Sequence, residues 1–239
     1  MSAIPLRKTV HYPDSDGLPM ADNDAQRKAM TNLIHSLETR YSGDRDVYIS
    51  GNLFIYYVEG NPGARVAPDA FVAFGVPGGP RRSFRVWEEG RMPAIVFEIA
   101  SQECWQDLLR KKKDLYERLG IGEYIVFDPD GEFIQPRLQG FRLERDRYRP
   151  VLLESDGSLV SQATGLRMLP EGENLRLVNT ATGERYPWVE EEREARMKET
   201  AARRAAEQQA AREAAARQIL EEELARLRSE LEGREKSGT

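Results

Sequence analysis

The chain has 239 residues, 40% of them hydrophobic, and its 35 lysines and arginines against 40 aspartates and glutamates give a formal net charge of −5. This acidic balance argues against a protein that coats nucleic acid indiscriminately, although it leaves room for a local basic cleft. The one cysteine, Cys104, excludes an internal disulfide and a cysteine-based zinc cage. No stretch approaches the ~18 apolar residues that span a bilayer, so we expect a cytoplasmic protein with no membrane partner.

The first 188 residues predict a mixed α/β domain. Apolar and small residues recur at helical spacing from Asn23 to Tyr41, which predicts a helix whose cap lies among residues 22–24. β-branched and aromatic residues then predict extended chain over residues 47–60, with Gly51 as a bulge or turn. A further strand is expected from Val66 to Phe74.

The next three elements form the expected centre of the sheet. Residues 94–100 are nearly continuous in apolar side chains, as in a strand buried on both faces. A helix is expected from Gln102 to Leu119, ended by Gly120, and a second apolar strand runs to Asp128-Pro129. This order predicts a βαβ crossover with parallel strands, followed by short hairpins at an edge of the sheet.

From Val189 onward the composition changes to Ala, Glu, Arg and Gln, without proline or aromatic residues, which predicts one long helix. We therefore divide the chain into a domain at residues 1–188 and a charged helix at residues 189–239. Four leucines near its end follow the four, three, four spacing of a coiled-coil seam: Leu220, Leu224, Leu227 and Leu231. A solvated helix and a helix that pairs with a partner or with its own copy both remain open.

Three charged residues stand where apolar ones are expected. Glu98 lies within the apolar strand, and a buried carboxylate is costly unless it is paired or binds a metal. Lys112 lies at the centre of the apolar face of the following helix, and Asp69 begins a strand directly after Pro68. Two carboxylates and an ammonium group would suit Mg²⁺ or Mn²⁺ and the cleavage of phosphodiesters. The alternative is a plain buried salt bridge between Glu98 and Lys112, with Asp69 capping a turn.

These residues resemble the PD-(D/E)XK nuclease signature, with A-P-D at residues 67–69 and E-I-A-S at residues 98–101. The segments SGNLFIYYVEGNPGARVAPDAFVAFGV and KKKDLYERLGIGEYIVFDP are similar to the Uma2 (Uma-two) family of restriction-endonuclease-like proteins. The similarity extends from about Asp22 to Tyr186. It implies an α/β fold with a restriction-endonuclease-like mixed central sheet flanked by helices.

The resemblance also implies roles for particular residues. Asp69, Glu98 and the main-chain carbonyl of Ile99 would be metal ligands, and Asp69, Glu98 and Lys112 would be the catalytic residues. Ala100 occupies the place of the signature lysine, a role that the family shifts to the next helix, where Lys112 lies. Relatives often carry a histidine near the start of the first helix, where this chain has Gln26, which puts a catalytic contribution of that helix in doubt.

Two functions follow from this reasoning. The first is a nuclease, dependent on Mg²⁺ or Mn²⁺, that hydrolyses phosphodiester bonds of nucleic acid, with DNA favoured. Its basic rim would come from residues 81–91, 110–113 and 142–149, which are rich in arginine and lysine. The second is an inert protein of nuclease fold that binds or assembles through its C-terminal helix, because fold does not guarantee activity.

Overall fold

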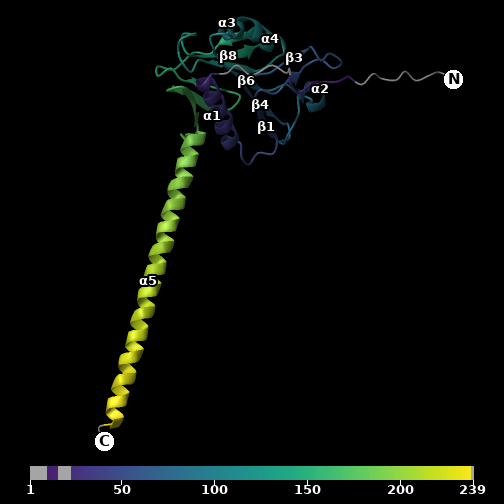
Figure 1. Cartoon of the computed structure of the whole chain (residues 1–239). Coiled ribbons are helices and arrows are strands. Elements are labelled where there is room, and N and C mark those ends of the chain that lie inside the picture. Colours follow the sequence, from purple (N-terminus) through teal and green to yellow (C-terminus); the bar gives the residue numbers. More distant parts are fainter. Residues whose placement is uncertain (1–9, 16–22, 238–239) are drawn as a thin grey trace, which may run out of the picture. The chain divides into compact units, whose positions relative to one another are not determined.

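A computed structural model describes residues 10–15 and 23–237 of the chain, with side chains described as far as residue 229. It has a mixed α/β domain followed by one long helix (Figure 1). The expected fold class, a mixed central sheet flanked by helices with a long C-terminal helix, is therefore confirmed.

The central sheet has six strands in the order β1-β4-β6-β7-β8-β9. Their bounds are β1 Val47–Ser50, β4 Ala70–Phe74, β6 Ile95–Ile99, β7 Glu123–Phe127, β8 Leu138–Glu144 and β9 Arg147–Pro150. β6 and β7 pair in parallel and every residue of both is buried, as the apolar runs predicted, while the other neighbours pair antiparallel. The expected βαβ crossover is confirmed.

Two small sheets flank the central one. One has the order β3-β2-β5, with bounds β2 Ile55–Tyr56, β3 Arg65–Val66 and β5 Phe84–Arg85, and it leads into the short helix α2 Val86–Glu89. The other has the order β10-β11-β12, with bounds β10 Leu159–Val160, β11 Leu166–Glu171 and β12 Asn174–Asn179. The prediction that all late hairpins lie at an edge of the central sheet holds for β8 and β9 but is wrong for these last three strands.

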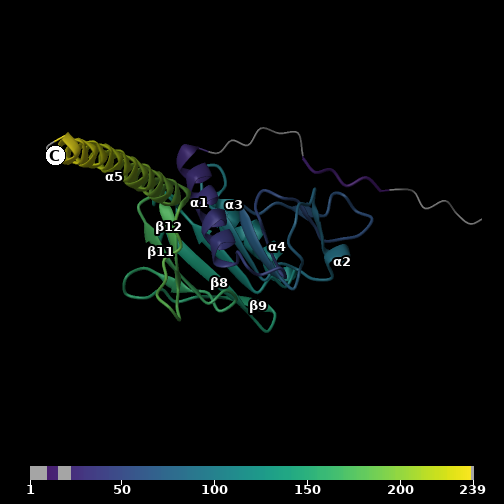
Figure 2. The same cartoon turned by 90° about the horizontal axis from the view of Figure 1, so that it is seen from below.

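Each face of the central sheet has its own apolar core. On one face, α1 (Asp24–Arg40) and the sheet β10-β11-β12 pack against Ile95, Phe97 and Ile99 of β6. Figure 2 shows β11 and β12 beside α1. On the other face, the helical segment after β6 packs near Val96 and Ala100. Since side chains alternate along a strand, Glu98 points to the same face as Val96 and Ala100, toward the helical segment.

The helix expected over residues 102–119 is continuous from Trp105 to Arg118, starts later than expected, and contains a π-helical turn. It consists of α3 (Trp105–Asp107), a π-helical turn η1 (Leu108–Lys112) and α4 (Lys113–Arg118). By contrast, α1 is regular and begins with a capping box, in which the Asn23 side chain accepts the Gln26 N–H and the Gln26 side chain accepts the Asn23 N–H.

The long helix α5 spans Val189–Ser237, and contacts divide the chain into two units between Val189 and Glu190. Within its own unit, ion pairs one turn apart join Glu192 to Arg196 and Arg203 to Glu207. Leu220, Leu224 and Leu227 are exposed, and the side chain of Leu231 lies outside the described residues. In the part of the chain that the structure describes, no helix combines the length and apolar character that crossing a membrane requires.

Candidate active site

The register of two antiparallel strands brings Asp69 toward Glu98. Ala70 at the start of β4 pairs with Phe97 of β6, so the residue before Ala70 faces the residue after Phe97. Directly opposed residues of an antiparallel pair point to the same face of a sheet. Asp69 and Glu98 therefore border one pocket, as their positions in the sequence predicted.

The backbone around Asp69 is held from two sides. Its Oδ2 accepts the Ile99 N–H at 2.6 Å, which ties the carboxylate to the end of β6. On the other side, the Asn52 N–H donates to the Pro68 carbonyl at 2.9 Å. A Cβ added at Gly51 would lie 2.1 Å from the Asp69 carbonyl oxygen, so this approach requires a glycine. The predicted bend at Gly51 thus packs against the candidate site.

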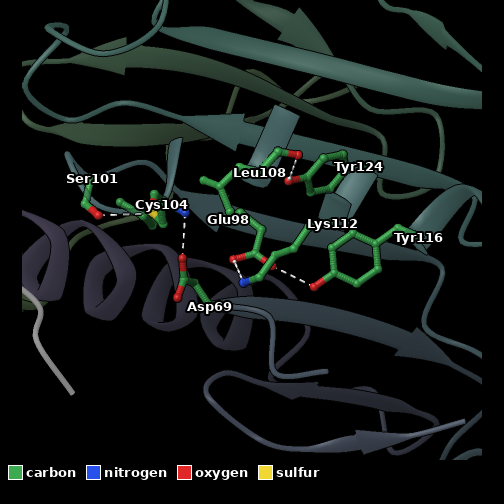
Figure 3. A network of polar contacts seen from close by, with 9 residues as sticks. Asp69, Glu98, Ser101, Cys104, Leu108, Lys112, Tyr116 and Tyr124 are labelled. Atoms are coloured by element: carbon green, nitrogen blue, oxygen red, sulfur yellow. Dashed lines mark hydrogen bonds and ion pairs between the residues drawn. The ribbon is translucent and has the colours of Figure 1, made fainter. Parts of the chain in front are cut away.

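Glu98 is 1% exposed and is bound by two side chains from the helical layer. The Lys112 ammonium lies 2.8 Å from both carboxylate oxygens, and the Tyr116 hydroxyl donates to Oε1 at 2.6 Å (Figure 3). The pairing of Lys112 with Glu98 was expected from the sequence. The role of Tyr116 was missed, because an aromatic residue in an apolar stripe was counted as core, although its spacing of four residues from Lys112 places it on the same helix face.

Both donors keep their protons. Burial alone would lower the pKa of Lys112, but the carboxylates of Glu98 and Asp69 outweigh it and raise the pKa above its ordinary value. Burial, reinforced by the charge of Glu98, raises the pKa of Tyr116 well above its ordinary value. Glu98 is therefore surrounded by a cation and a neutral hydroxyl donor. The Lys112 side chain remains 32% exposed, so this buried carboxylate is connected to solvent through its partner.

The pocket has a volume of about 260 Å³ and carries three carboxylates against one ammonium group. Its lining residues come from α1, the start of β4 and the region from β6 to η1: Gln26, Met30, Asp69, Glu98, Ile99, Ser101, Glu103, Cys104 and Lys112. Glu103 and Ser101 had no assigned role in the sequence reasoning. Gln26 is buried, and its Nε2 donates to the Ala100 carbonyl at 3.1 Å, so α1 does border the pocket.

The donor atoms fit a hard divalent cation. A carboxylate offers about four lone-pair positions, and Lys112 and Tyr116 supply three donors to Glu98, so one acceptor position remains. The Ile99 carbonyl accepts a weak contact at 3.8 Å from the Cys104 thiol. Within the described residues, no three His, Cys, Asp or Glu side chains gather closely enough to hold an ion, so a main-chain carbonyl would have to complete the set.

Most arginines of the expected basic rim are paired with acids. Arg81 binds Glu89, Arg85 binds Glu88, and Arg142 binds the buried Glu123. In the segment after β6, Arg110 is exposed and Lys111 binds Asp107 at an exposed site. Arg110 and Lys111, on the helical segment of Lys112, are therefore accessible. Arg82 is accessible as well, with a side chain 89% exposed, whereas the Arg81 side chain is 16% exposed.

The family model Uma2, described as "Putative restriction endonuclease", matches residues 11–171. Among solved structures, the chain is similar to one described as a putative nuclease belonging to DUF820 from Anabaena variabilis ATCC 29413. The sequence identity is 16% and the TM-score 0.46, over 62% of this chain and 77% of that chain. At this level the likeness carries no argument about activity. A comparison with curated proteins found no match.

Proposed function

The chain belongs to the Uma2 family, and we propose that it is a metal-dependent nuclease that hydrolyses phosphodiester bonds of nucleic acid. One observation carries the proposal: a buried glutamate, held by a lysine and a tyrosine, borders a polar pocket together with a second carboxylate. Buried charge in a solvent-connected pocket is costly for stability and is typical of catalytic sites.

Asp69, Glu98 and the Ile99 carbonyl would hold Mg²⁺ or Mn²⁺, since all three offer the hard oxygen donors that these ions prefer. When bound, such an ion polarises the phosphoryl oxygen and lowers the pKa of a coordinated water. The excess of carboxylates over ammonium groups in the pocket favours a divalent cation there.

Lys112 supplies positive charge rather than a base. Its raised pKa keeps it protonated near neutral pH, so it orients water and stabilises negative charge that develops on a phosphoryl group. Tyr116 fixes the Oε1 side of Glu98 by donating its hydroxyl proton. Gln26 holds the backbone at Ala100, directly after the proposed carbonyl ligand.

The size of the pocket limits how a substrate could bind. A volume of about 260 Å³ suits a phosphate group and its water but not a duplex, so the nucleic acid backbone would lie across the mouth. Arg110, Lys111 and Lys113 lie on the helical segment that contributes Lys112, and we propose that they contact neighbouring phosphates. We favour DNA as the substrate and a reducing cytoplasm as the compartment, which suits the free thiol of Cys104.

Calorimetric titration with Mn²⁺, followed by incubation with single-stranded and double-stranded DNA, tests this function. The wild type should bind the ion and cleave at least one substrate, while Asp69→Ala should lose both properties and remain folded. A wild type that binds no Mn²⁺ and cleaves neither substrate would contradict the proposal.

A second function, assembly through α5, is favoured by one observation. Leu220, Leu224 and Leu227 are each at least half exposed and follow a coiled-coil spacing. Burying such a seam against a second copy of the helix would stabilise a dimer. This role is compatible with an active or an inactive pocket.

A further inference from the structure

The helical segment after β6 departs from α-geometry immediately before the residues that bind Glu98. At the end of η1, the Lys113 N–H is shared between the carbonyls of Arg110 and Leu108, and the bond to Leu108 joins residues five apart. A π-helical turn of this kind takes up one residue more than an α-helical turn, and it is frequent at functional sites. The turn therefore needs a physical cause that stabilises it here.

The extra residue decides which side chains share a face. Leu108 and Tyr116 are eight residues apart, and both are fully buried. In an uninterrupted α-helix, eight residues exceed two turns by about 80°. Absorbing one residue into η1 brings the separation close to two turns, so Leu108 packs into the core while Lys112 and Tyr116 both reach Glu98.

Tyr124 of β7 binds the carbonyl at which the turn begins. Its hydroxyl donates to the Leu108 carbonyl at 3.1 Å (Figure 3). This oxygen therefore accepts from both the Tyr124 hydroxyl and the Lys113 N–H. Tyr124 pairs with Val96 in the parallel register of β6 and β7. The hydroxyl thus joins the π-helical turn to the two strands at the centre of the sheet, one of which carries Glu98.

We propose that Tyr124 is a positioning residue that fixes the π-helical turn and thereby holds Lys112 against Glu98. An effect of Tyr124 on catalysis rests on the proposed nuclease function, whereas its effect on the position of Lys112 does not. Tyr124 is buried and is not among the pocket-lining residues, and its ring packs against that of Tyr116 with centroids 5.1 Å apart. Its hydroxyl would therefore act through the backbone of η1, while its ring contact with Tyr116 is kept in a phenylalanine variant.

Tyr148 provides a matched control. Its hydroxyl also donates to a buried main-chain carbonyl, that of Ile121, at 2.9 Å. Its ring stacks on the ring of Tyr124 with centroids 6.2 Å apart. Replacing either tyrosine with phenylalanine removes one buried hydroxyl from the same aromatic cluster, but only Tyr124→Phe removes a donor from η1.

The ¹⁵N signal of the Lys112 ammonium group tests the placement, because ammonium protons held in an ion pair exchange slowly enough to be observed. The signal is assigned by its absence in Lys112→Met. Tyr124→Phe should lose it, and the amide protons of residues 112 and 113 should exchange at least ten times faster than in the wild type. Tyr148→Phe should keep both properties. If Tyr124→Phe keeps the ammonium signal, or if both variants lose it equally, the proposal is wrong.

An assay of DNA cleavage then distinguishes the proposed nuclease function from the proposed positioning role of Tyr124. If the wild type cleaves, Tyr124→Phe should lower kcat at least tenfold with KM unchanged, and Tyr148→Phe should lower it less than twofold. Equal kcat values for the wild type and Tyr124→Phe would overturn the catalytic part. A wild type without cleavage would refute the nuclease function and leave the magnetic resonance comparison to decide whether Tyr124 positions Lys112.

Discussion

Two buried glutamates lie on the paired parallel strands β6 and β7, at opposite ends and on opposite faces. Glu98 lies near the end of β6, and Glu123 begins β7 and pairs with Ile95. Glu123 is 3% exposed and accepts hydrogen bonds from Arg142, the Ser161 hydroxyl and the N–H groups of residues 162 and 163. Glu98 is equally buried, but its partners are one half-buried lysine and one tyrosine.

The two sites differ in their access to solvent and not in the burial of the glutamate side chain. The donors to Glu123 come largely from the loop after β10, so this carboxylate fastens that loop to the central sheet. Glu98 borders a pocket at the carboxyl end of its strand, the end at which open α/β sheets bind ligands. A buried carboxylate alone therefore does not identify a catalytic residue, whereas a buried carboxylate with one partner exposed in a pocket is a candidate.

The largest loss of stability is expected for Glu123→Ala. It would leave Arg142 without its buried partner and free the loop after β10, at a cost of about 3–5 kcal/mol. Thermal unfolding measures this loss, and cleavage by the remaining folded protein should be nearly unchanged. A variant that melts normally but fails to cleave would reverse the roles given to the two glutamates.

Gly51→Ala should cost about 1–3 kcal/mol, because its Cβ meets the Asp69 carbonyl oxygen and the strand must shift. Unlike Glu123→Ala, this change should also weaken Mn²⁺ binding, measured by calorimetry, since the shift displaces Asp69. Gly43→Ala is the control, because an added Cβ at Gly43 meets nothing within 4 Å. Unaltered Mn²⁺ affinity in Gly51→Ala would argue against Asp69 as a ligand.

Lys112→Met should lower both stability and activity. Removing one partner of a buried ion pair leaves the other charge uncompensated, so the loss should lie near the lower end of about 3–5 kcal/mol, because the lysine site is partly exposed and Tyr116 still donates to Glu98. Cleavage should fall at least about 100-fold, as expected for the loss of one electrostatic stabiliser. A loss of 3–5 kcal/mol together with surviving cleavage would identify Lys112 and Glu98 as a structural salt bridge.

Two neighbouring lysines are the controls for this variant. Lys111 is paired with Asp107 at the surface, and Lys113 lies over the Phe141 ring. Lys111→Met and Lys113→Met should lower the affinity for nucleic acid and reduce the salt dependence of this affinity. Their effect on the turnover rate should be smaller.

The alkaline stability of the same variant tests the ion pair. Because the pKa of Lys112 is raised in the folded state, its contribution is present below the ordinary lysine value and is lost as pH rises through the raised value. The wild type should therefore lose stability at strongly alkaline pH, and Lys112→Met should lose less. If the wild type and Lys112→Met lose equal stability at alkaline pH, folding does not raise the pKa of Lys112.

The smallest effect on the domain is expected from removing α5. A chain ending after Glu194 keeps Trp188, whose ring packs against Arg176, and Val189, whose N–H donates to Asn32. The domain that contains both glutamates should then unfold at the same temperature as in the full chain. Sedimentation should show a dimer for the full chain and a monomer for the shortened one, and equal monomeric masses would exclude assembly through α5.

Much of this fold could be predicted because the determining patterns are local. The apolar runs of β6 and β7 predicted their parallel pairing, and the helical spacing around Lys112 predicted its approach to Glu98. The π-helical turn was not predicted, because Lys112 is four residues from both Leu108 and Tyr116, and each of these pairs taken alone is also a neighbouring pair on a regular α-helix.

Other features depend on contacts between distant segments. The turn residues of β10, β11 and β12 predicted hairpins but not their pairing as a separate sheet beside α1. Glu123 received no role because it follows a glycine turn, and its partners lie 19 to 40 residues later in the chain. The shared metal of Asp69, Glu98 and Ile99 remains a prediction.

Anomalous diffraction from crystals soaked in Mn²⁺ tests the central claim that Glu98, and not Glu123, belongs to a metal site. The account predicts one ion within about 2.0–2.3 Å of oxygen atoms from Asp69, Glu98 and the Ile99 carbonyl. An ion at Glu123, no ion in the pocket at saturating Mn²⁺, or carboxylates of Asp69 and Glu98 more than ~8 Å apart would contradict it.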